Sequence, residues 1–299
     1  MAAEATLVVQ PVPVPVRIAR RAWRLRRLPL IPMLILAVFI ATGIFAPLIA
    51  PHDPERGSLR ERNLPPAWEE GGTTKFLLGT DHLGRDMLSR VIFGARISLV
   101  VAAVTLVVGM GIGVASGLAA GWYGGWIDEI LMRVVDIKLA IPTILLALVL
   151  VLALGQSFMI IVAVLAIAVW PRFARNVRGE VLQLKTMDFV ALAKVAGAST
   201  PRILFIHIFP GVINTLIVLA TLEIGIVILL ESTLSFLGAG VPPPTPAWGS
   251  MVSDGRDRLA VAWWISTMPG LAIMLTVLSM NLFGDWLRDR LDPRLRQLG

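Results

Sequence analysis

The chain has 299 residues, of which 56% are apolar and 16% are charged, and its mean hydropathy is +0.79. This composition excludes an ordinary soluble globular protein and predicts a polytopic membrane protein. The net charge of +7 does not indicate nucleic acid binding, because the arginines lie mainly beside apolar runs, as the positive-inside rule predicts. The sequence contains no cysteine, which excludes a disulfide, a thiolate nucleophile and a cysteine-ligated metal.

The N-terminal region is expected to be a basic cytoplasmic tail, residues 1–27, followed by a first membrane helix, residues 28–50. Proline alternates with valine in 11–15, which favours extended backbone, and six arginines follow in 17–27. The apolar run is long enough to cross a bilayer. It is longer than the apolar part of a signal peptide and has no clean small-x-small cleavage site, so we favour an uncleaved span.

Residues 51–96 are expected to form an extracytoplasmic loop that ends in an interfacial helix. Acidic side chains balance the basic ones here, which fits the outer side of a membrane. The helix would be capped near Asp81 and would carry Arg90 at head-group depth. Asp81, His82 and Asp86 could form a metal site, but cap and turn roles explain the same residues, and we prefer them.

Residues 97–284 are expected to form a core of five membrane-crossing helices, so that the protein has about six in all. The core spans are predicted at about 97–120, 134–154 (interrupted at Pro142), 158–170, 212–234 and 261–283. Four crossings separate the N-terminal arginines from a basic loop that begins near Arg172, which places both in the cytoplasm. Residues 285–299 are expected to be a cytoplasmic C-terminal tail.

Four glycines in the first core span recur at every fourth residue. They are Gly109, Gly113, Gly117 and Gly121. Residues four apart share one face of a helix, so we expect a neighbouring helix to approach this face closely.

The segment 178–210 is moderately polar and lies between two strongly apolar runs. Residues 189–196 have the pattern of a short helix, Gly197 breaks it, and the Ser-Thr-Pro of 199–201 begins a second helix. A bent element of mixed polarity is not stable in lipid, because backbone groups at the break need water or protein partners. We therefore expect it at a membrane surface, where it either contacts another protein or is a solvated connection.

Two acidic residues, Glu223 and Glu231, lie within the predicted span 212–234. A carboxylate inside a membrane is costly and by default indicates a function. Eight residues apart on a helix correspond to a rotation of about 80°, so the two side chains face broadly the same side. They either line a polar pathway, in which Glu231 contacts substrate or a binding protein, or pair with helix-end or interfacial groups.

Three strings resemble the C-type permease subunits of dipeptide and oligopeptide transporters, which belong to the ATP-binding cassette (ABC) class. The first begins at Gly79 and reads GTDHLGRDMLSRVIFGARISL. The second begins at Leu234 and reads LSFLGAGVPPPTPAWG, with Ala239 where the family usually has leucine. The third, residues 187–210, resembles the cytoplasmic coupling loop of ABC importer permeases.

Within this coupling loop, Ala193 and Gly197 match the last alanine and the glycine of the family pattern. The glutamate of the pattern is replaced by Ala191 and its middle alanine by Leu192, so the charge contact of that glutamate is not carried over. The resemblance implies that the loop docks in a groove of a separate ATPase subunit. The residues expected to contribute are Asp188, Ala191, Ala193, Lys194, Gly197, Ala198, Pro201, His207 and Pro210.

The resemblance implies an all-α type I ABC importer permease fold and a transport subunit, not an enzyme. It further implies a bacterial or archaeal cell membrane, a heterodimer with a sister permease, two ATPase subunits inside and a solute-binding protein outside. ATP and Mg²⁺ would bind the ATPases, because this chain has no GxxxxGK[ST] phosphate loop and no cofactor is expected in it. The alternatives are an ion-gradient-driven transporter, an importer of nickel or oligosaccharide, and an intramembrane enzyme or scaffold.

Overall fold

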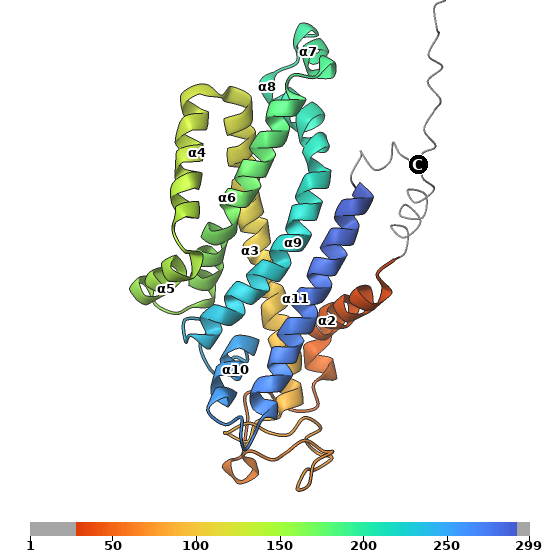
Figure 1. Ribbon diagram of the computed structural model, residues 1–299, viewed down its shortest axis with the longest axis vertical. Coiled ribbons are helices and arrows are strands. Elements are labelled where there is room, and N and C mark those ends of the chain that lie inside the picture. The colour runs from red at the N-terminus through yellow and green to blue at the C-terminus, as the bar shows by residue number, and fades with distance from the viewer. Residues whose placement is uncertain (1–27, 292–299) are drawn as a thin grey trace, which may run out of the picture.

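The computed structural model describes residues 28–291, and each regular element in this range is a helix (Figure 1). The elements are α2 (Leu30–Ile49), η1 (Leu59–Glu61), α3 (Met87–Tyr123), α4 (Gly125–Ala140), α5 (Thr143–Leu154), α6 (Phe158–Leu184), α7 (Asp188–Val195), α8 (Thr200–Arg202), η2 (Ile203–Ile208), α9 (Phe209–Phe236), α10 (Trp248–Arg256) and α11 (Trp264–Leu291). The expected tail 1–27 and residues 292–299 of the expected C-terminal tail lie outside the described residues.

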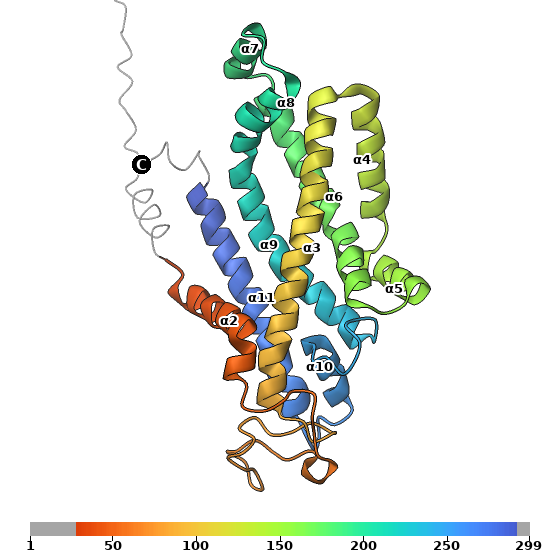
Figure 2. The same ribbon diagram turned by 180° about the vertical axis from the view of Figure 1, so that it is seen from behind.

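Within the described range, five helical stretches are long and apolar enough to cross a membrane. They are α2, α3, α6, the stretch Thr200–Phe236 that ends with α9, and α11. The pair α4 and α5 passes the same test together but is bent by 92° at the break, where Pro142 lacks the N–H that would continue the helix. The expectation of an all-α protein with about six membrane helices is therefore confirmed, with one span sharply bent (Figure 2).

The predicted close approach at the four glycines is confirmed, and the neighbouring helix is α6. A Cβ atom added to Gly117 would lie 2.7 Å from the carbonyl oxygen of Ala174, and one added to Gly121 would lie 2.7 Å from the Cβ of Val181. Real Cβ atoms do not approach other atoms this closely, so only glycine allows the two backbones to pack at this distance.

Helix α3 begins ten residues before the predicted span 97–120, so the expected interfacial helix and the second span are one continuous helix. Asp86 caps it by accepting a hydrogen bond from the backbone N–H of Ser89 at 3.1 Å. Arg90 is 3% exposed and donates to the carbonyl oxygen of Pro54 at 3.2 Å. The guanidinium of Arg90 thus holds the outer loop and is not exposed, and its expected position at head-group depth stays a prediction.

Helix α6 is also longer than the predicted span 158–170, because it continues through Pro171 to Leu184. The sequence pattern placed Arg172 in a cytoplasmic loop, but it lies near the middle of the helix. Its neighbour Phe173 packs against Gly113, well inside the apolar part of α3. The assignment of Arg172 to a loop was wrong because a charge inside a span was interpreted as a mark of the membrane surface.

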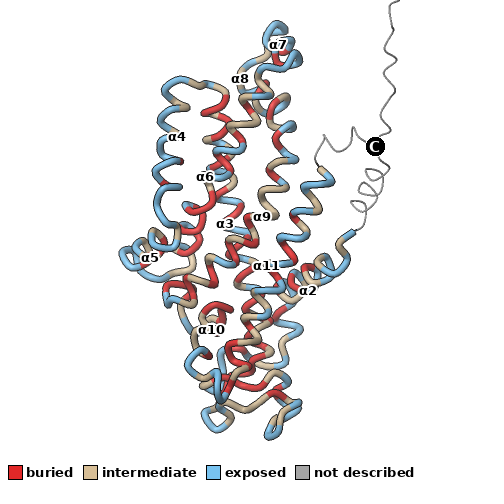
Figure 3. Tube along the Cα trace, viewed as in Figure 1, coloured by how far each residue is buried: buried red, intermediate tan, exposed pale blue. Residues whose placement is uncertain are grey.

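The loop between α2 and α3 forms a cap at one end of the molecule, opposite the end that carries α7 and α8 (Figures 1 and 2). The indole N–H group of Trp264 fastens this cap to α11 by donating to the carbonyl oxygen of Thr80 at 2.9 Å. Buried residues concentrate where α3, α6, α9 and α11 meet (Figure 3). The core therefore connects the two ends of the molecule.

Asp81 and Asp86, which the sequence offered as metal ligands, are used within the cap. The Asp81 carboxylate accepts hydrogen bonds from the backbone N–H of Leu83 and from Nε of Arg85, at 2.8 and 2.6 Å. Asp86 lies 3.2 Å from Nδ1 of His52. These contacts are those of turn and cap residues, and no group of three possible ligands is assembled among residues 28–291.

Candidate functional site

Helices α7 and α8 project beyond the spans as a small tip (Figure 1). Large apolar side chains of α7 are exposed on this tip. Phe189, Leu192 and Val195 follow one another at three-residue spacing on α7 and are 42%, 68% and 88% exposed. On the inner side, Val190 and Ile203 are fully or nearly fully buried and hold the tip on the spans. An exposed apolar patch on a rigid support is typical of a surface that contacts another protein.

The turn between α7 and α8 is the helix ending that the sequence predicted at Gly197. Gly197 has a φ of +76°, a backbone conformation that favours glycine. Its N–H donates to the carbonyl oxygen of Lys194, and the N–H of Ala198 donates to that of Ala193, both at 3.0 Å. These two hydrogen bonds form a Schellman motif, which fixes the angle between α7 and the following chain.

The expected coupling residues do not all lie on the surface of the tip. Ala193 is buried, and Ala198 and His207 are partly buried. His207 lies in η2, and Pro210 begins α9, so both belong to the base of the tip. The residues that are exposed are Asp188, Ala191, Lys194, Gly197, Pro201 and Pro210.

The structure shows exposed apolar residues on the tip that were not among the residues expected from the resemblance to the coupling loop. The apolar residues Phe189, Leu192 and Val195 were not among the expected contacts, although they are the most prominent apolar side chains of the tip. Their three-residue spacing on a predicted short helix is the signal that could have identified them.

The two acidic residues of α9 are both buried, and each has a nearby partner. Oε1 of Glu223 accepts a hydrogen bond from the guanidinium of Arg172 on α6 at 2.9 Å. Oε1 of Glu231 accepts one from the hydroxyl of Ser235 at 2.7 Å. In this chain, Glu231 is 1% exposed and so does not face an open pathway.

Charged residues of α6 also hold the bent pair α4 and α5. Arg178 forms a bidentate ion pair with Asp128 of α4, and Arg175 forms an ion pair with Asp136. Lys138, near the end of α4, is 8% exposed and donates to the carbonyl oxygen of Ala168 at 2.6 Å. Lys138 was not among the residues predicted from the sequence, although a single lysine within an apolar region indicates a functional or paired group.

Two family models match the chain. Residues 109–297 match the binding-protein-dependent transport system inner membrane component, and residues 15–66 match the N-terminal membrane domain of oligopeptide transport permease C. The chain belongs to the binding-protein-dependent transport permease family. It is therefore an inner membrane component of a transport system, as the sequence resemblance implied, and a multi-pass membrane protein.

Curated members of this permease family resemble the chain over most of its length. The dipeptide transport system permease protein DppC of Escherichia coli K12 is 51% identical over 263 residues, covering 88% of this chain and 87% of that protein. The di/tripeptide transport system permease protein DppC of Pseudomonas aeruginosa UCBPP-PA14 is 40% identical over 264 residues, with the same coverage. The Haemophilus influenzae DppC is 42% identical over 268 residues, covering 90% of this chain and 91% of the relative.

Solved structures support the same architecture. A chain of the MetNI methionine ABC transporter in an inward-facing conformation matches with a TM-score of 0.56 at 18% identity, over 69% of this chain and 98% of that chain. A chain of an amino acid ABC transporter matches with a TM-score of 0.51 at 14% identity, over 68% and 94%. The permease has the type I ABC importer fold that was expected.

Proposed function

We propose that this permease is one of two membrane-spanning subunits of an ATP-driven importer of di- and oligopeptides. Its relatives with up to 51% identity are named as dipeptide and di/tripeptide permeases, and the alignments cover nearly nine tenths of each chain. Import of nickel or oligosaccharide receives no comparable support. The peptide assignment therefore rests on the relatives, whereas the coupling assignment rests on the geometry of the tip.

The observation that carries the coupling role is the exposed apolar surface of α7 on a rigid turn. ATPase subunits that bind this surface can drive transport only if they hold it differently before and after ATP binding. The Schellman motif at Gly197 keeps α7 from swivelling freely, so that a displacement of α7 is passed to α6 and α9. In the proposed complex ATP and Mg²⁺ bind the ATPases, and the sequence of this chain contains no GxxxxGK[ST] phosphate loop.

The proposed complex contains this permease, a sister permease, two ATPases and an extracytoplasmic solute-binding protein. The tip faces the cytoplasm, together with both termini, because the arginines are concentrated near that end of the spans. The cap formed by residues 51–86 and the proline-rich segment before α10 face outward, where a solute-binding protein would dock.

Purification of the chain from its native membrane tests this proposal. We expect two ATPases, a second permease and a solute-binding protein to be recovered with it, and we expect peptide-loaded binding protein to stimulate ATP hydrolysis. Recovery of the chain without an ATPase would contradict the coupling role. Stimulation by a nickel- or oligosaccharide-loaded binding protein, and not by a peptide-loaded one, would contradict the substrate assignment alone.

A further inference from the structure

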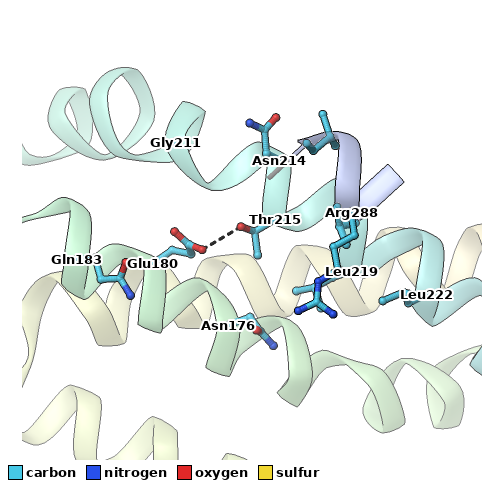
Figure 4. A pocket seen from close by; sticks show the side chains of 11 residues that line it. Asn176, Glu180, Gln183, Gly211, Asn214, Thr215, Leu219, Leu222 and Arg288 are labelled. Carbon is cyan, nitrogen blue, oxygen red and sulfur yellow. Dashed lines mark hydrogen bonds between the residues drawn. The ribbon is translucent and has the colours of Figure 1, made fainter. Parts of the chain in front are cut away.

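A polar face runs along α6 and α9 in the half of the molecule nearest the tip. Asn176, Glu180 and Gln183 recur on α6 at spacings of four and three residues, so they share one side of the helix. Together with residues of α9 and α11 they line a cavity of about 730 Å³ (Figure 4). The polar residues contributed by these two helices are Asn214, Thr215 and Arg288.

Arg172 extends this polar face by one further turn of α6 toward the middle of the spans. The amide of Asn176, which lines the cavity, donates to the backbone carbonyl of Arg172 at 2.8 Å. The Arg172 side chain is 48% exposed, whereas that of its partner Glu223 is 4% exposed. The buried carboxylate therefore holds the guanidinium at the inner end of the polar face through a contact to Nη1, and nearly half of the Arg172 side chain stays exposed.

The charges around this point are not balanced. Lys138 donates to the carbonyl oxygen of Ala168, which lies one helical turn before Arg172. Two cationic side chains thus gather near one carboxylate, that of Glu223. A position with excess positive charge favours an anion, and a guanidinium can bind a carboxylate through two parallel hydrogen bonds.

A half-exposed guanidinium at this depth is not compatible with contact to lipid chains. The face must therefore meet water or protein, and the polar cavity lined by Asn176, one turn of α6 from Arg172, favours water. We propose that this face lines the cytoplasmic half of the translocation pathway and that Arg172, positioned by Glu223, binds the C-terminal carboxylate of the peptide in transit. This inference rests on the proposed function of peptide import.

Competition with Glu223 is the feature that suits Arg172 to a transit site. A carboxylate that arrives along the pathway must displace part of an existing ion pair, so it is bound without being held firmly. A site on a conduction path has to be favourable enough for entry and weak enough for release. Glu223 also has one oxygen, Oε2, without a hydrogen-bond partner among residues 28–291, so its pairing can be rearranged.

Thiol accessibility tests whether the face is aqueous. The natural chain has no cysteine, so Asn176→Cys introduces the only thiol of this subunit. In inside-out vesicles that contain the complete complex, we expect a membrane-impermeant methanethiosulfonate reagent to label it. The control is Leu282→Cys on α11, because Leu282 is an exposed apolar residue of a membrane-spanning helix. Its neighbour Gly284 packs against Leu222 of α9. Absence of labelling at position 176, or equal labelling at both positions, would overturn the proposal.

Exchange of the charged pair tests the role of Arg172. If the pair is only structural, the double variant Arg172→Glu with Glu223→Arg restores the contact and transports peptide normally. If Arg172 receives the peptide carboxylate, the double variant still hydrolyses ATP when the loaded binding protein is added, but peptide uptake falls by about tenfold or more.

Uptake close to the wild-type rate, or failure of the exchanged subunit to assemble, would contradict the proposal. A wild-type complex whose ATP hydrolysis does not respond to peptide-loaded binding protein would instead contradict the proposed function. The two failures are therefore distinguishable in the same assay.

Discussion

The ammonium group of Lys194 on α7 lies 4.9 Å from the centre of the Trp122 ring at the end of α3. A second contact is close by: Lys185, which follows α6, donates to the carbonyl oxygen of Gly121 at 2.7 Å. The tip is thus connected to α3 as well as to the helices that precede and follow it in the chain. Movement of α7 can therefore be passed to the helix that packs along the whole of α6.

Removal of the Lys194 contact should weaken coupling without abolishing it. A cation–π contact at an exposed site contributes about 0.5–1 kcal/mol, so Lys194→Ala is expected to lower the amount of peptide transported per ATP by about two- to fivefold. Lys194→Arg preserves the contact and serves as the control. Equal ratios of transport to hydrolysis in the two variants would mean that the contact with Trp122 has no part in coupling.

A charge at the turn of the tip should abolish transport while leaving the chain in the membrane. Gly197→Asp places a carboxylate beside the apolar surface of α7, and apart from its two chain neighbours no described residue has a heavy atom within 4 Å of the added Cβ. Gly197→Asn is the matched control, because it has nearly the same shape and backbone preference without the charge. We expect peptide uptake to be lost in the aspartate variant and to fall only partly in the asparagine variant. Normal uptake by Gly197→Asp would contradict the coupling assignment.

The close packing of the α3 glycines against α6 predicts that valine in place of two different glycines of α3 has very different effects on stability. In Gly117→Val the new side chain overlaps Ala174 and Val177, and overpacking of this kind costs about 1–3 kcal/mol. Gly111→Val is the control, because no described atom outside its chain neighbours and the nearby backbone of α3 lies within 4 Å of its added Cβ. The thermal unfolding of the purified complex should shift to lower temperature in Gly117→Val alone. Similar shifts in both variants would show that α3 and α6 are not tightly packed at Gly117.

The indole of Trp264 should stabilise the outer cap through its N–H group. Trp264→Phe leaves the buried carbonyl oxygen of Thr80 without this donor, which costs about 1–3 kcal/mol. We therefore expect protease added from the outer side to cut residues 51–86 faster in this variant. The control is Trp68→Phe within the cap, because Trp68 is 60% exposed. Unchanged cleavage in Trp264→Phe would mean that the cap is held mainly by other contacts.

The sequence predicted the features that depend on local patterns. The four glycines identified a close helix contact because a spacing of four defines one helix face, and only the identity of the partner helix had to come from the structure. The bend at Gly197 was likewise predicted, since a glycine after a short helix and a Ser-Thr-Pro start are local signals. Pro142 indicated a break, but the 92° angle depends on packing against α6 and was not predictable.

The features that depend on contacts between distant residues could not be obtained from the sequence. Glu223 was identified as an unusual carboxylate, but its partner Arg172 is 51 residues away and was assigned to a loop. Similarly, the sequence did not indicate that Arg90 is buried and donates to the carbonyl oxygen of Pro54, 36 residues away. In both cases a charged residue looked solvent-exposed because the group that neutralises or binds it is remote in the chain.

The energy source of transport is the most direct test of the central claim. The complete complex, reconstituted in liposomes with peptide-loaded binding protein on the outer side, should take up peptide when ATP is supplied on the side of the tip and no ion gradient is present. An ion gradient alone should give no uptake. Uptake driven by the gradient and indifferent to ATP would contradict the account and would identify the chain as a secondary transporter.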